Sequence, residues 1–483
     1  MTPQTSSSAP AGAAALPAWK AEGAVVLASC YELGRQPLGL ASPLAILRRA
    51  GYRPRALDVA VDPFSAAAAA GARFFGVSVP MHTALRLGVA LARQARAANP
   101  DCHICFYGLY ALLNADYLLE NGADSVIGGE VEAPLLALID ALAAGRSASS
   151  AAGVGTRERA APPHLEKPPL APPHREGLPD LRRYARLAKD GELLTAGAVE
   201  ASRGCKHLCR HCPIPPVYGG RFFAVPREIV LEDVRRLAAA GARHITFADP
   251  DFLNGPTHAL RVAREMHAAF PGLTFDFTAK VEHLIRHADL LAEFRALGCL
   301  FVISAVESLS DAVLENLEKD HTRAEVFRAL EAVRRAGLSL RPTFVAFTPW
   351  TEADDYFDLL DFVEREGLID EVDPVQFAIR LLIPPGSHLL ERPGLLPTLG
   401  PLDAENFIHR WGHPDPRMDR LHEAVLPLSE EAAEREEDSA LTIGRIRALA
   451  AEILERPERA GPLGPAPAPD RLRPPRMTES WFC

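Results

Sequence analysis

The sequence predicts an α/β protein. We expect an N-terminal doubly wound, flavodoxin-like parallel sheet, then a (β/α)6 partial barrel of the TIM type and a helical C-terminal extension. Short, almost wholly apolar segments alternate with amphipathic ones, as in strands that are buried on both faces. Glycines follow the amphipathic segments where helices should end. A chain of 483 residues is long enough for two or three hydrophobic cores.

The N-terminal sheet is predicted over residues 23–145, after a disordered tail at residues 1–22. Its expected strands are residues 24–29, 55–59, 72–79, 103–108 and 124–128. The helical patterns between them cover residues 40–50, 84–97 and 132–143. Open parallel sheets bind ligands outside the carboxyl ends of their strands, so the loops at those ends are candidate binding segments.

The partial barrel is predicted over residues 195–385, after an Ala- and Pro-rich linker at residues 146–194. Its expected strands are residues 198–203, 244–248, 274–279, 300–305, 340–347 and 375–382. The expected helices are residues 227–240, 257–270, 284–297, 323–336 and 352–366. A helical region at 386–455 follows, and a Pro-rich tail at 456–483 ends in TESWFC. Barrels of this kind carry catalytic groups at the carboxyl ends of their strands.

Composition excludes several classes of protein. A formal net charge of −10 argues against a protein that coats nucleic acid, so no nucleic-acid partner is expected. No apolar run approaches the ~20 residues of a membrane span, and the first twenty residues do not resemble a signal peptide. Eight cysteines are too few for a secreted disulfide scaffold. We therefore expect a cytoplasmic protein without a membrane partner.

Three of the cysteines fall within eight residues, in the sequence GCKHLCRHCP. Cys205, Cys209 and Cys212 follow the first predicted barrel strand at its carboxyl end. Three thiolates on a [4Fe–4S] cluster leave one iron open for a small molecule. The alternative is a structural zinc site with His207 or His211 as the fourth ligand, although no second Cys-x-x-Cys follows.

The CxxxCxxC spacing at this place resembles the radical S-adenosylmethionine (SAM) enzymes. The resemblance implies that the open iron chelates the amino and carboxylate groups of SAM, and that one electron from the cluster yields a 5′-deoxyadenosyl radical. It also implies an electron donor of the flavodoxin or ferredoxin type and a small-molecule or peptide substrate. His211 precedes the third cysteine, where the family often places an aromatic residue near the adenine.

The resemblance continues along the barrel. In FADPDFLNG, Asp249 and Asp251 lie where the family places acidic groups near the SAM ammonium. In VISAVESLS, Glu307 and Ser308 match a Glu-Ser pair near the SAM ribose or carboxylate, and ENLEKDHT continues that similarity. Each acid taken alone is equally typical of a helix cap or a solvated charge.

The N-terminal domain resembles the cobalamin-binding domain of the B12-dependent subgroup, in QPLGLASPLAILRRAGYRPRALD, GVSVPMHT and IGGEVEAPL. The cobalamin contacts that this resemblance implies are Gly39, Ser78, Gly108, Gly128 and Gly129. The first loop, residues 30–38, lacks the His of the DxHxxG motif, so cobalamin would lack that ligand to cobalt. The alternative is a degenerate domain that serves only as a scaffold.

Three functions follow from these patterns. The first is a radical SAM enzyme whose cobalamin transfers a methyl group or assists a rearrangement. The second is a radical SAM enzyme without cobalamin, including methylthio transfer, which usually needs three further cluster cysteines. The third is a zinc-stabilised binding protein without catalysis.

Two cysteine features remain. Cys102 and Cys105 lie in a strand pattern, which places their thiols on opposite faces and predicts buried structural cysteines. The final TESWFC resembles the tails of radical SAM proteins that end in a Cys-Sec or Cys-Cys pair followed by Ala-Glu-Pro. That resemblance implies a UGA selenocysteine codon after Cys483 that was read as a stop.

Overall fold

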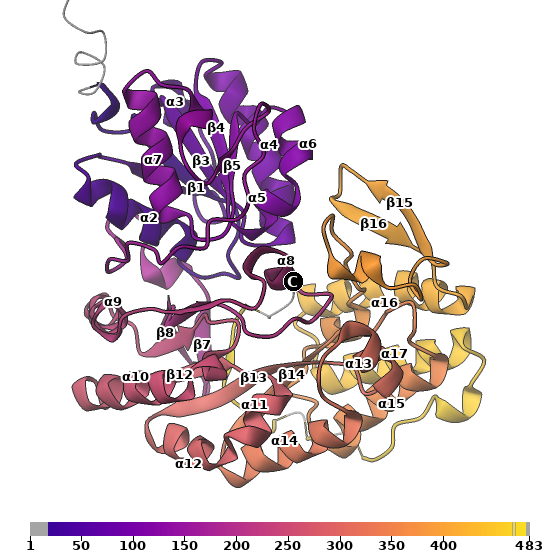
Figure 1. The fold of residues 1–483 in the computed structure, drawn as a ribbon. Helices are drawn as coiled ribbons and strands as arrows, with labels where there is room; N and C mark the ends of the chain where they lie inside the picture. The colour runs from indigo at the N-terminus through magenta and orange to yellow at the C-terminus, as the bar shows by residue number, and fades with distance from the viewer. Residues whose placement is uncertain (1–17, 466, 469, 480–483) are drawn as a thin grey trace, which may run out of the picture. The chain divides into compact units, whose positions relative to one another are not determined.

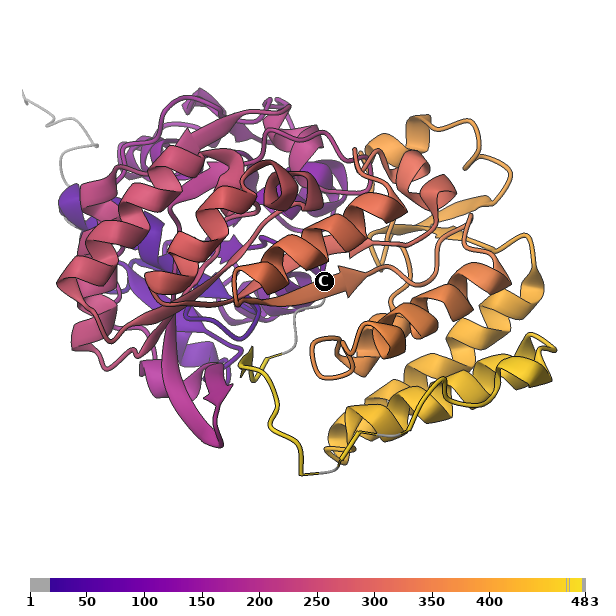
Figure 2. The same ribbon diagram turned by 90° about the horizontal axis from the view of Figure 1, so that it is seen from below.

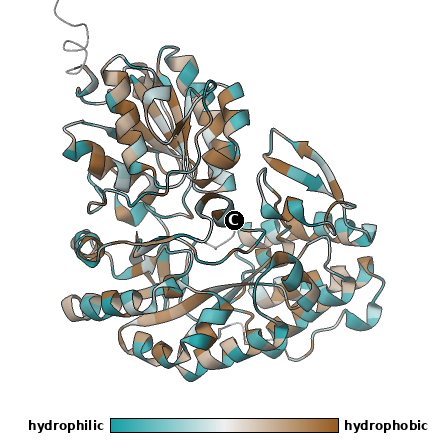
Figure 3. Ribbon diagram, viewed as in Figure 1, coloured by the Kyte–Doolittle hydropathy of each residue, from teal (hydrophilic) through white to brown (hydrophobic). Residues whose placement is uncertain are grey.

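The chain forms two compact units, residues 1–180 and 181–483, and each contains a sheet with helices packed on it (Figure 1). The computed structural model describes residues 18–465, 467–468 and 470–479. Hydrophobic residues mark the strands of both units in Figure 3. Among the described helices, none is both long and apolar enough to cross a membrane.

The first unit contains a six-stranded sheet in the order β2-β1-β3-β4-β5-β6. The strands are β1 (Val25–Ser29), β2 (Arg55–Asp58), β3 (Phe74–Ser78), β4 (His103–Tyr107), β5 (Ser125–Ile127) and β6 (Val154–Gly155). The first five are parallel and β6 is antiparallel to β5. The order 2-1-3-4-5 is that of flavodoxin-like sheets, as predicted.

The helices of this unit cover both faces of the sheet (Figure 1). They are α2 (Leu38–Arg49), α3 (Ala66–Ala70), α4 (His82–Ala98), α5 (Leu109–Leu113), α6 (Ala115–Glu120) and α7 (Glu132–Ala143). Leu44 of α2 and Leu138 of α7 share one core cluster with Leu27 and Phe74 of the sheet. The apolar stripe of each helix thus follows from its sequence period.

The folded part of this unit extends beyond the predicted bounds at both ends. Trp19, predicted in the tail, is 9% exposed and belongs to the core cluster, and Lys20 Nζ donates to Ala50 O. Residues 1–17 of the predicted tail lie outside the described residues. Part of the predicted linker also belongs here, because it includes β6 and because His164 forms a bridge with Gly129.

The second unit contains a seven-stranded sheet in the order β14-β13-β12-β11-β8-β7-β17. The strands are β7 (Arg186–Lys189), β8 (Glu192–Val199), β11 (His244–Phe247), β12 (Thr274–Thr278), β13 (Cys299–Glu307), β14 (Ser339–Phe344) and β17 (Arg476–Met477). β8 and β11 to β14 are parallel, whereas β7 is antiparallel to β8 and β17 is antiparallel to β7. The predicted linker therefore ends before β7.

The helices of the barrel alternate with its parallel strands. They are α9 (Arg227–Ala239), α10 (Pro256–Ala269), α11 (Val281–Arg286), α12 (Ala288–Ala296), α13 (Asp311–Leu317), α14 (Arg323–Arg335) and α15 (Ala353–Arg365). Leu187 of β7 packs in one cluster with Phe301 and Ile303 of β13, although three strands separate β7 from β13 in the sheet. That contact requires the sheet to curl, which confirms a partial barrel.

The predicted sixth barrel strand, residues 375–382, is not a strand. Its first part is the 3-10 helix η4 (Pro374–Ala378), and only a single parallel bridge joins Phe347 and Arg380. Pro374 fixes the backbone at the start of η4, and the side chain of Gln376 accepts a hydrogen bond from Phe344 N (2.9 Å). A side-chain oxygen thus replaces the strand carbonyl that would have paired with the end of β14.

The C-terminal extension is helical only in part. It begins with the 3-10 helix η5 (His388–Glu391) and the hairpin of β15 (Leu399–Asp403) and β16 (Ile408–Trp411). Helices α16 (Pro416–Glu434) and α17 (Ser439–Ile453) then lie side by side (Figure 2).

The Pro-rich tail packs against the second unit after the 3-10 helix η6 (Pro457–Arg459). Arg471 forms ion pairs with Asp370 and Asp438 (2.7 and 3.0 Å), and β17 pairs with β7. Residues 480–483, with Cys483, lie outside the described residues.

Candidate functional site

The three clustered cysteines lie on a loop that begins after β8. The short strands β9 (Ser202–Gly204) and β10 (Phe222–Ala224) pair and close this loop, which also contains helix α8 (Ile214–Tyr218). Gly204 precedes the first cysteine with φ +72°, and a Cβ there would lie 2.3 Å from Arg221 O. Only glycine fits this position, so the turn into the cysteine loop depends on it.

The cysteine thiols are largely removed from water. Cys209 is buried, and Cys205 and Cys212 are partly buried. Burial, together with smaller repulsive contributions from the nearby Cys209 and Cys205, raises the pKa of Cys212 to about 12. A metal centre bound by these cysteines would favour their thiolate forms, because metal ligation deprotonates a thiol.

In the part of the chain that the structure describes, the three cysteines do not belong to a compact group of potential metal ligands. Among the described residues, the one group of three potential ligands whose atoms all lie within 4.8 Å is His207, Asp251 and His283, and it contains no cysteine. Zn–S bonds of ~2.3 Å in a tetrahedron place sulfurs only about 3.8 Å apart. The three cysteines are not part of that compact group, which favours a larger cluster over one zinc ion.

The cysteine loop is fixed to the far side of the barrel. Arg210 N donates to Leu317 O (3.0 Å), and the Arg210 guanidinium pairs with Glu318. Lys319, which is 3% exposed, follows directly. Burial lowers the pKa of Lys319, but Glu307, Cys209 and Cys212 outweigh burial and raise it. A buried ammonium therefore lies close enough to the thiols to offset part of their negative charge.

Glu307 connects this ammonium to the predicted adenine neighbour. Its carboxylate accepts from Lys319 Nζ (3.3 Å) and contacts His211 Nε2 (3.1 Å). Burial alone would raise its pKa, yet Lys319 and His211 hold the pKa at about 2. Glu307 also has φ +69°, a strained backbone for a residue with a Cβ. The structure therefore brings together Glu307 and His211, two of the residues predicted from the sequence.

Asp249 and Ser308 have structural partners of their own. The Asp249 carboxylate accepts from Ala201 N (2.9 Å) and from the Ser202 hydroxyl. Burial raises the pKa of Asp249 to about 7 in spite of these bonds. Ser308 Oγ accepts from Ser310 N (3.1 Å) at the start of α13. As contacts of SAM, Asp249 and Ser308 remain predictions.

Asp251 lies at the centre of a buried polar group. It is 0% exposed, its Oδ1 accepts from Leu253 N (2.9 Å), and its Oδ2 lies 2.7 Å from His283 Nδ1. His207 of the cysteine loop is 3.6 Å from the same oxygen, and Lys280 Nζ is 3.1 Å from His207 Nδ1. The Lys280 ammonium supplies the positive charge in this group, so we do not assign a metal ion to it. As a SAM contact, Asp251 also remains a prediction.

Asn254 is a residue of the site that sequence reasoning missed. Its amide Nδ2 donates to Cys205 Sγ at 3.6 Å, within hydrogen-bonding range for sulfur. A buried asparagine three residues after Asp251 has no distinctive spacing. Only the fold of the loop after β11 brings it to the cysteine.

The residues predicted to contact cobalamin gather at the carboxyl edge of the first sheet, but protein atoms explain them. A Cβ on Gly39 would lie 2.3 Å from Ser78 Oγ, and one on Gly128 would lie 2.5 Å from Leu112. Gly129 has φ +80°, and a Cβ there would lie 2.3 Å from His164 O. Gly108 has φ +112°, and its Cβ would meet the backbone of β3's end at 3.1 Å. Their role as cobalamin contacts stays a prediction.

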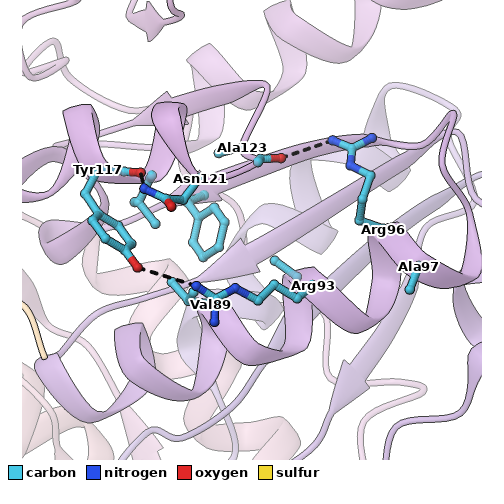
Figure 4. Close-up of a pocket in the computed structure, with 11 residues that line it drawn as sticks. Val89, Arg93, Arg96, Ala97, Tyr117, Asn121 and Ala123 are labelled. Atoms are coloured by element: carbon cyan, nitrogen blue, oxygen red, sulfur yellow. Dashed lines mark hydrogen bonds between the residues drawn. The ribbon is translucent and has the colours of Figure 1, made fainter. Parts of the chain in front are cut away.

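A cavity of about 250 Å³ in the first unit lies between α4 and α6 (Figure 4). Arg93 and Tyr117 face each other across it, with 3.5 Å between Nη2 and the hydroxyl. It is lined by the C-terminal half of α4 rather than by the loops at the carboxyl ends of the strands. It is therefore not the predicted ligand edge.

The remaining described cysteines are buried and free of disulfides. They are Cys30, Cys102, Cys105 and Cys299. Burial raises the pKa of Cys30, Cys102 and Cys105 to about 12, which keeps them as neutral thiols. This confirms the prediction that Cys102 and Cys105 are buried.

Sequence comparison finds known proteins that are similar to this chain. Residues 199–361 match the radical SAM superfamily. The chain is 26% identical over 328 residues to a hopanoid C-3 methylase of Methylococcus capsulatus, covering 65% of this chain and 62% of that protein. It is 26% identical over 310 residues to the uncharacterized methyltransferase PH0819 of Pyrococcus horikoshii, covering 62% and 65%. The matches thus span slightly less than two thirds of these relatives.

Solved structures share the fold of both units. The apo form of OxsB, a cobalamin-dependent SAM radical enzyme, matches with a TM-score of 0.68 and 15% identity, covering 89% of this chain and 71% of that one. The radical SAM methyltransferase TsrM of Kitasatospora setae, bound to tryptophan and a SAM analogue, matches with a TM-score of 0.57 and 18% identity, covering 70% of each chain. At such identities the likeness establishes the fold.

Proposed function

We propose that this protein is a cobalamin-dependent radical SAM enzyme of the methyltransferase type. The observation that carries the proposal is the loop of Cys205, Cys209 and Cys212 at the carboxyl edge of a curled sheet, close to the buried ammonium of Lys319. The match of residues 199–361 to the radical SAM superfamily supports it.

The three thiolates would hold a [4Fe–4S] cluster. When bound, such a cluster with an open iron binds SAM and supplies the electron that cleaves it. The chain's own residues prepare this site: Lys319 offsets thiolate charge, and Glu307 keeps Lys319 charged and orients His211. A flavodoxin- or ferredoxin-type donor would supply the electron.

Cobalamin would bind at the carboxyl edge of the first sheet. The flavodoxin-like strand order and the likeness to TsrM and OxsB support this assignment. The loop of residues 30–38 has no histidine, so cobalt would lack a histidine ligand from this loop. Hydroxocobalamin added during reconstitution should be retained after gel filtration, with its absorption spectrum; a colourless protein would contradict cobalamin binding.

The reaction would be transfer of a methyl group to a small-molecule or peptide substrate. The hopanoid C-3 methylase and the uncharacterized methyltransferase PH0819 support methyl transfer. The cytoplasm, with its low-potential electron donors, is the proposed location.

Radical SAM chemistry without cobalamin is the second candidate. A ribosomal protein uS12 methylthiotransferase of Phocaeicola vulgatus is 24% identical over 186 residues, covering 35% of this chain and 40% of that protein. The spacing of the remaining cysteines does not offer a second cluster, which favours the cobalamin-dependent reaction.

An anaerobic assay tests the radical chemistry. The purified protein should contain iron and sulfide, and with dithionite and SAM it should release 5′-deoxyadenosine. Zinc without iron, or no 5′-deoxyadenosine from an iron-loaded protein, would contradict the proposal and favour a binding protein.

We also propose that the chain belongs with the radical SAM proteins that end in a Cys-Sec or Cys-Cys pair followed by Ala-Glu-Pro. The support is the sequence TESWFC at residues 478–483.

A further inference from the structure

The turn after β11 holds the first cysteine of the loop through one side chain. Asn254 is 2% exposed and ends the 3-10 turn η3 (Phe252–Asn254). Its Nδ2 donates to Cys205 Sγ (3.6 Å), and its Oδ1 accepts from Lys206 N (3.4 Å). Its backbone carbonyl accepts from Lys206 Nζ (2.6 Å). Asn254 therefore contacts both residues at the start of the cysteine loop.

The orientation of this amide follows from its partners. A backbone N–H only donates, so the side of the amide facing Lys206 N must be the carbonyl oxygen. The NH2 group then faces the sulfur of Cys205. An amide can offer a donor and an acceptor at once, whereas leucine of similar size offers neither.

The turn that carries Asn254 is itself held by buried groups. Asp251 Oδ1 caps η3 at Leu253 N, and Asn254 N donates to Asp251 O (3.1 Å). The other oxygen of Asp251 lies 2.7 Å from His283 Nδ1 in the first turn of α11. The buried carboxylate that sequence analysis assigned to SAM thus has a second use, because it fixes the turn from which Asn254 reaches the cysteine.

We propose that Asn254 is a positioning residue for the iron–sulfur cluster: its amide fixes Cys205 and raises the reduction potential of the cluster. This inference rests on the proposed function, because it requires a cluster on the three thiolates. Hydrogen bonds to the sulfurs are among the factors that set the potential of such clusters. An N–H donor stabilises the more negative, reduced cluster over the oxidised one, so its removal makes reduction harder.

The test is a reductive titration of the reconstituted full-length protein, monitored by electron paramagnetic resonance. In Asn254→Leu the ratio of reduced to oxidised cluster at a fixed potential should fall about tenfold, equivalent to a potential lower by about 59 mV for one electron. Asn254→Ser, which keeps one hydroxyl donor, should lie between Asn254→Leu and the wild type.

Asn316→Leu is the matched control. The Asn316 amide donates to Ala312 O within α13, and this variant should leave the potential unchanged. If Asn254→Leu holds no iron while Asn316→Leu does, the role in fixing Cys205 is supported and Asn254→Ser carries the measurement of potential.

Two results would overturn the inference, and they differ. A wild-type protein that binds no cluster would overturn the proposed function and this assignment together. If the wild-type protein binds a cluster, and Asn254→Leu and Asn254→Ser both have the wild-type potential, only the assignment of Asn254 is overturned.

Discussion

Each unit contains a Cys-x-x-Cys sequence, and the two pairs lie in different surroundings. Cys102 directly precedes β4 and Cys105 lies within it, and both are 0% exposed. Their neighbour His103 stacks on Phe74 with ring centroids 5.6 Å apart. Burial raises the pKa of both thiols to about 12, and nothing in this core favours the thiolate enough to reverse that effect.

Cys209 and Cys212 have the same spacing but lie on a loop that has polar and charged neighbours. Burial also raises the pKa of Cys212 to about 12. Here, however, a third thiol, the buried ammonium of Lys319 and the amide of Asn254 are close to the loop. The spacing of two cysteines is therefore no guide to their chemistry until the element that carries them and the charges around them are known.

The largest expected effect is the loss of the metal centre. Cys209→Ala and Cys212→Ala should reduce iron content and 5′-deoxyadenosine formation to background, because a cluster held by two thiolates has lost one of its anchors. Cys102→Ala and Cys105→Ala should keep their iron. Iron analysis of the four variants measures this difference. Loss of iron only in Cys102→Ala and Cys105→Ala would contradict the assignment of the cluster to the second unit.

Glu307→Gln should have the next largest effect, a loss of unfolding free energy. It leaves the ammonium of Lys319 buried without its carboxylate, and breaking such a buried pair costs about 3–5 kcal/mol of unfolding free energy. Glu318→Gln, which breaks the more exposed pair with Arg210, should cost ~1 kcal/mol or less. Urea denaturation at pH 7 measures both.

The same pair has a defined pH dependence. The pKa of Glu307 is lowered to about 2, so its stabilising effect is present above the unfolded pKa of about 4.3 and is lost as the pH falls toward 2. The difference in stability between wild type and Glu307→Gln should shrink over that range. A difference that stays constant with pH would contradict the pairing.

The pH dependence of stability that comes from Asp249 should have the opposite sign, because burial raises the pKa of Asp249 to about 7. The folded state then binds the proton more tightly than the unfolded state, so stability falls as the pH rises from about 4 to 7. At ~1.4 kcal/mol per pKa unit the loss is roughly 2–4 kcal/mol. Asp249→Asn should lack this slope in urea denaturation at pH 5 and pH 8; parallel profiles would contradict the shifted pKa.

The smallest effect concerns the first unit, and it separates packing from ligand binding. Gly129→Ala places a Cβ against His164 O at a positive φ and should cost about 1–3 kcal/mol without any cobalamin present. Gly71→Ala, where nothing lies within 4 Å, is the control and should melt like the wild type. If Gly129→Ala melts normally but no longer retains hydroxocobalamin, the glycine serves the ligand instead.

Much of the fold was predictable because the signals are local. The strands β1, β3 and β4 and the helices α4 and α14 fall within two residues of their predicted positions, since apolar period and helix-stop glycines lie within each segment. The predicted strand at 375–382 failed because its apolar residues could equally pack as a 3-10 helix. In the structure, the side chain of Gln376 takes the place of a strand partner at Phe344 N.

The candidate site was predictable only in part. The three cysteines and the acids at the strand ends are visible in the sequence, and Glu307 and His211 do meet. The contact of Asn254 with Cys205, 49 residues away, could not be predicted from the sequence. The pairing of residues 476–477 with the edge strand β7 could not be predicted either. Both depend on which distant segments the sheet brings together.

The sequence by itself determined the two βα domains, the cysteine loop and the family it resembles, because periodicity and spacing are properties of short segments. Only the tertiary structure decided which charges are buried together. It placed Lys319 beside Glu307 and the thiols, and it filled the space beside Gly129 with His164. The physical reason is that desolvation and close packing depend on neighbours far along the chain, and a pattern along the chain does not record them.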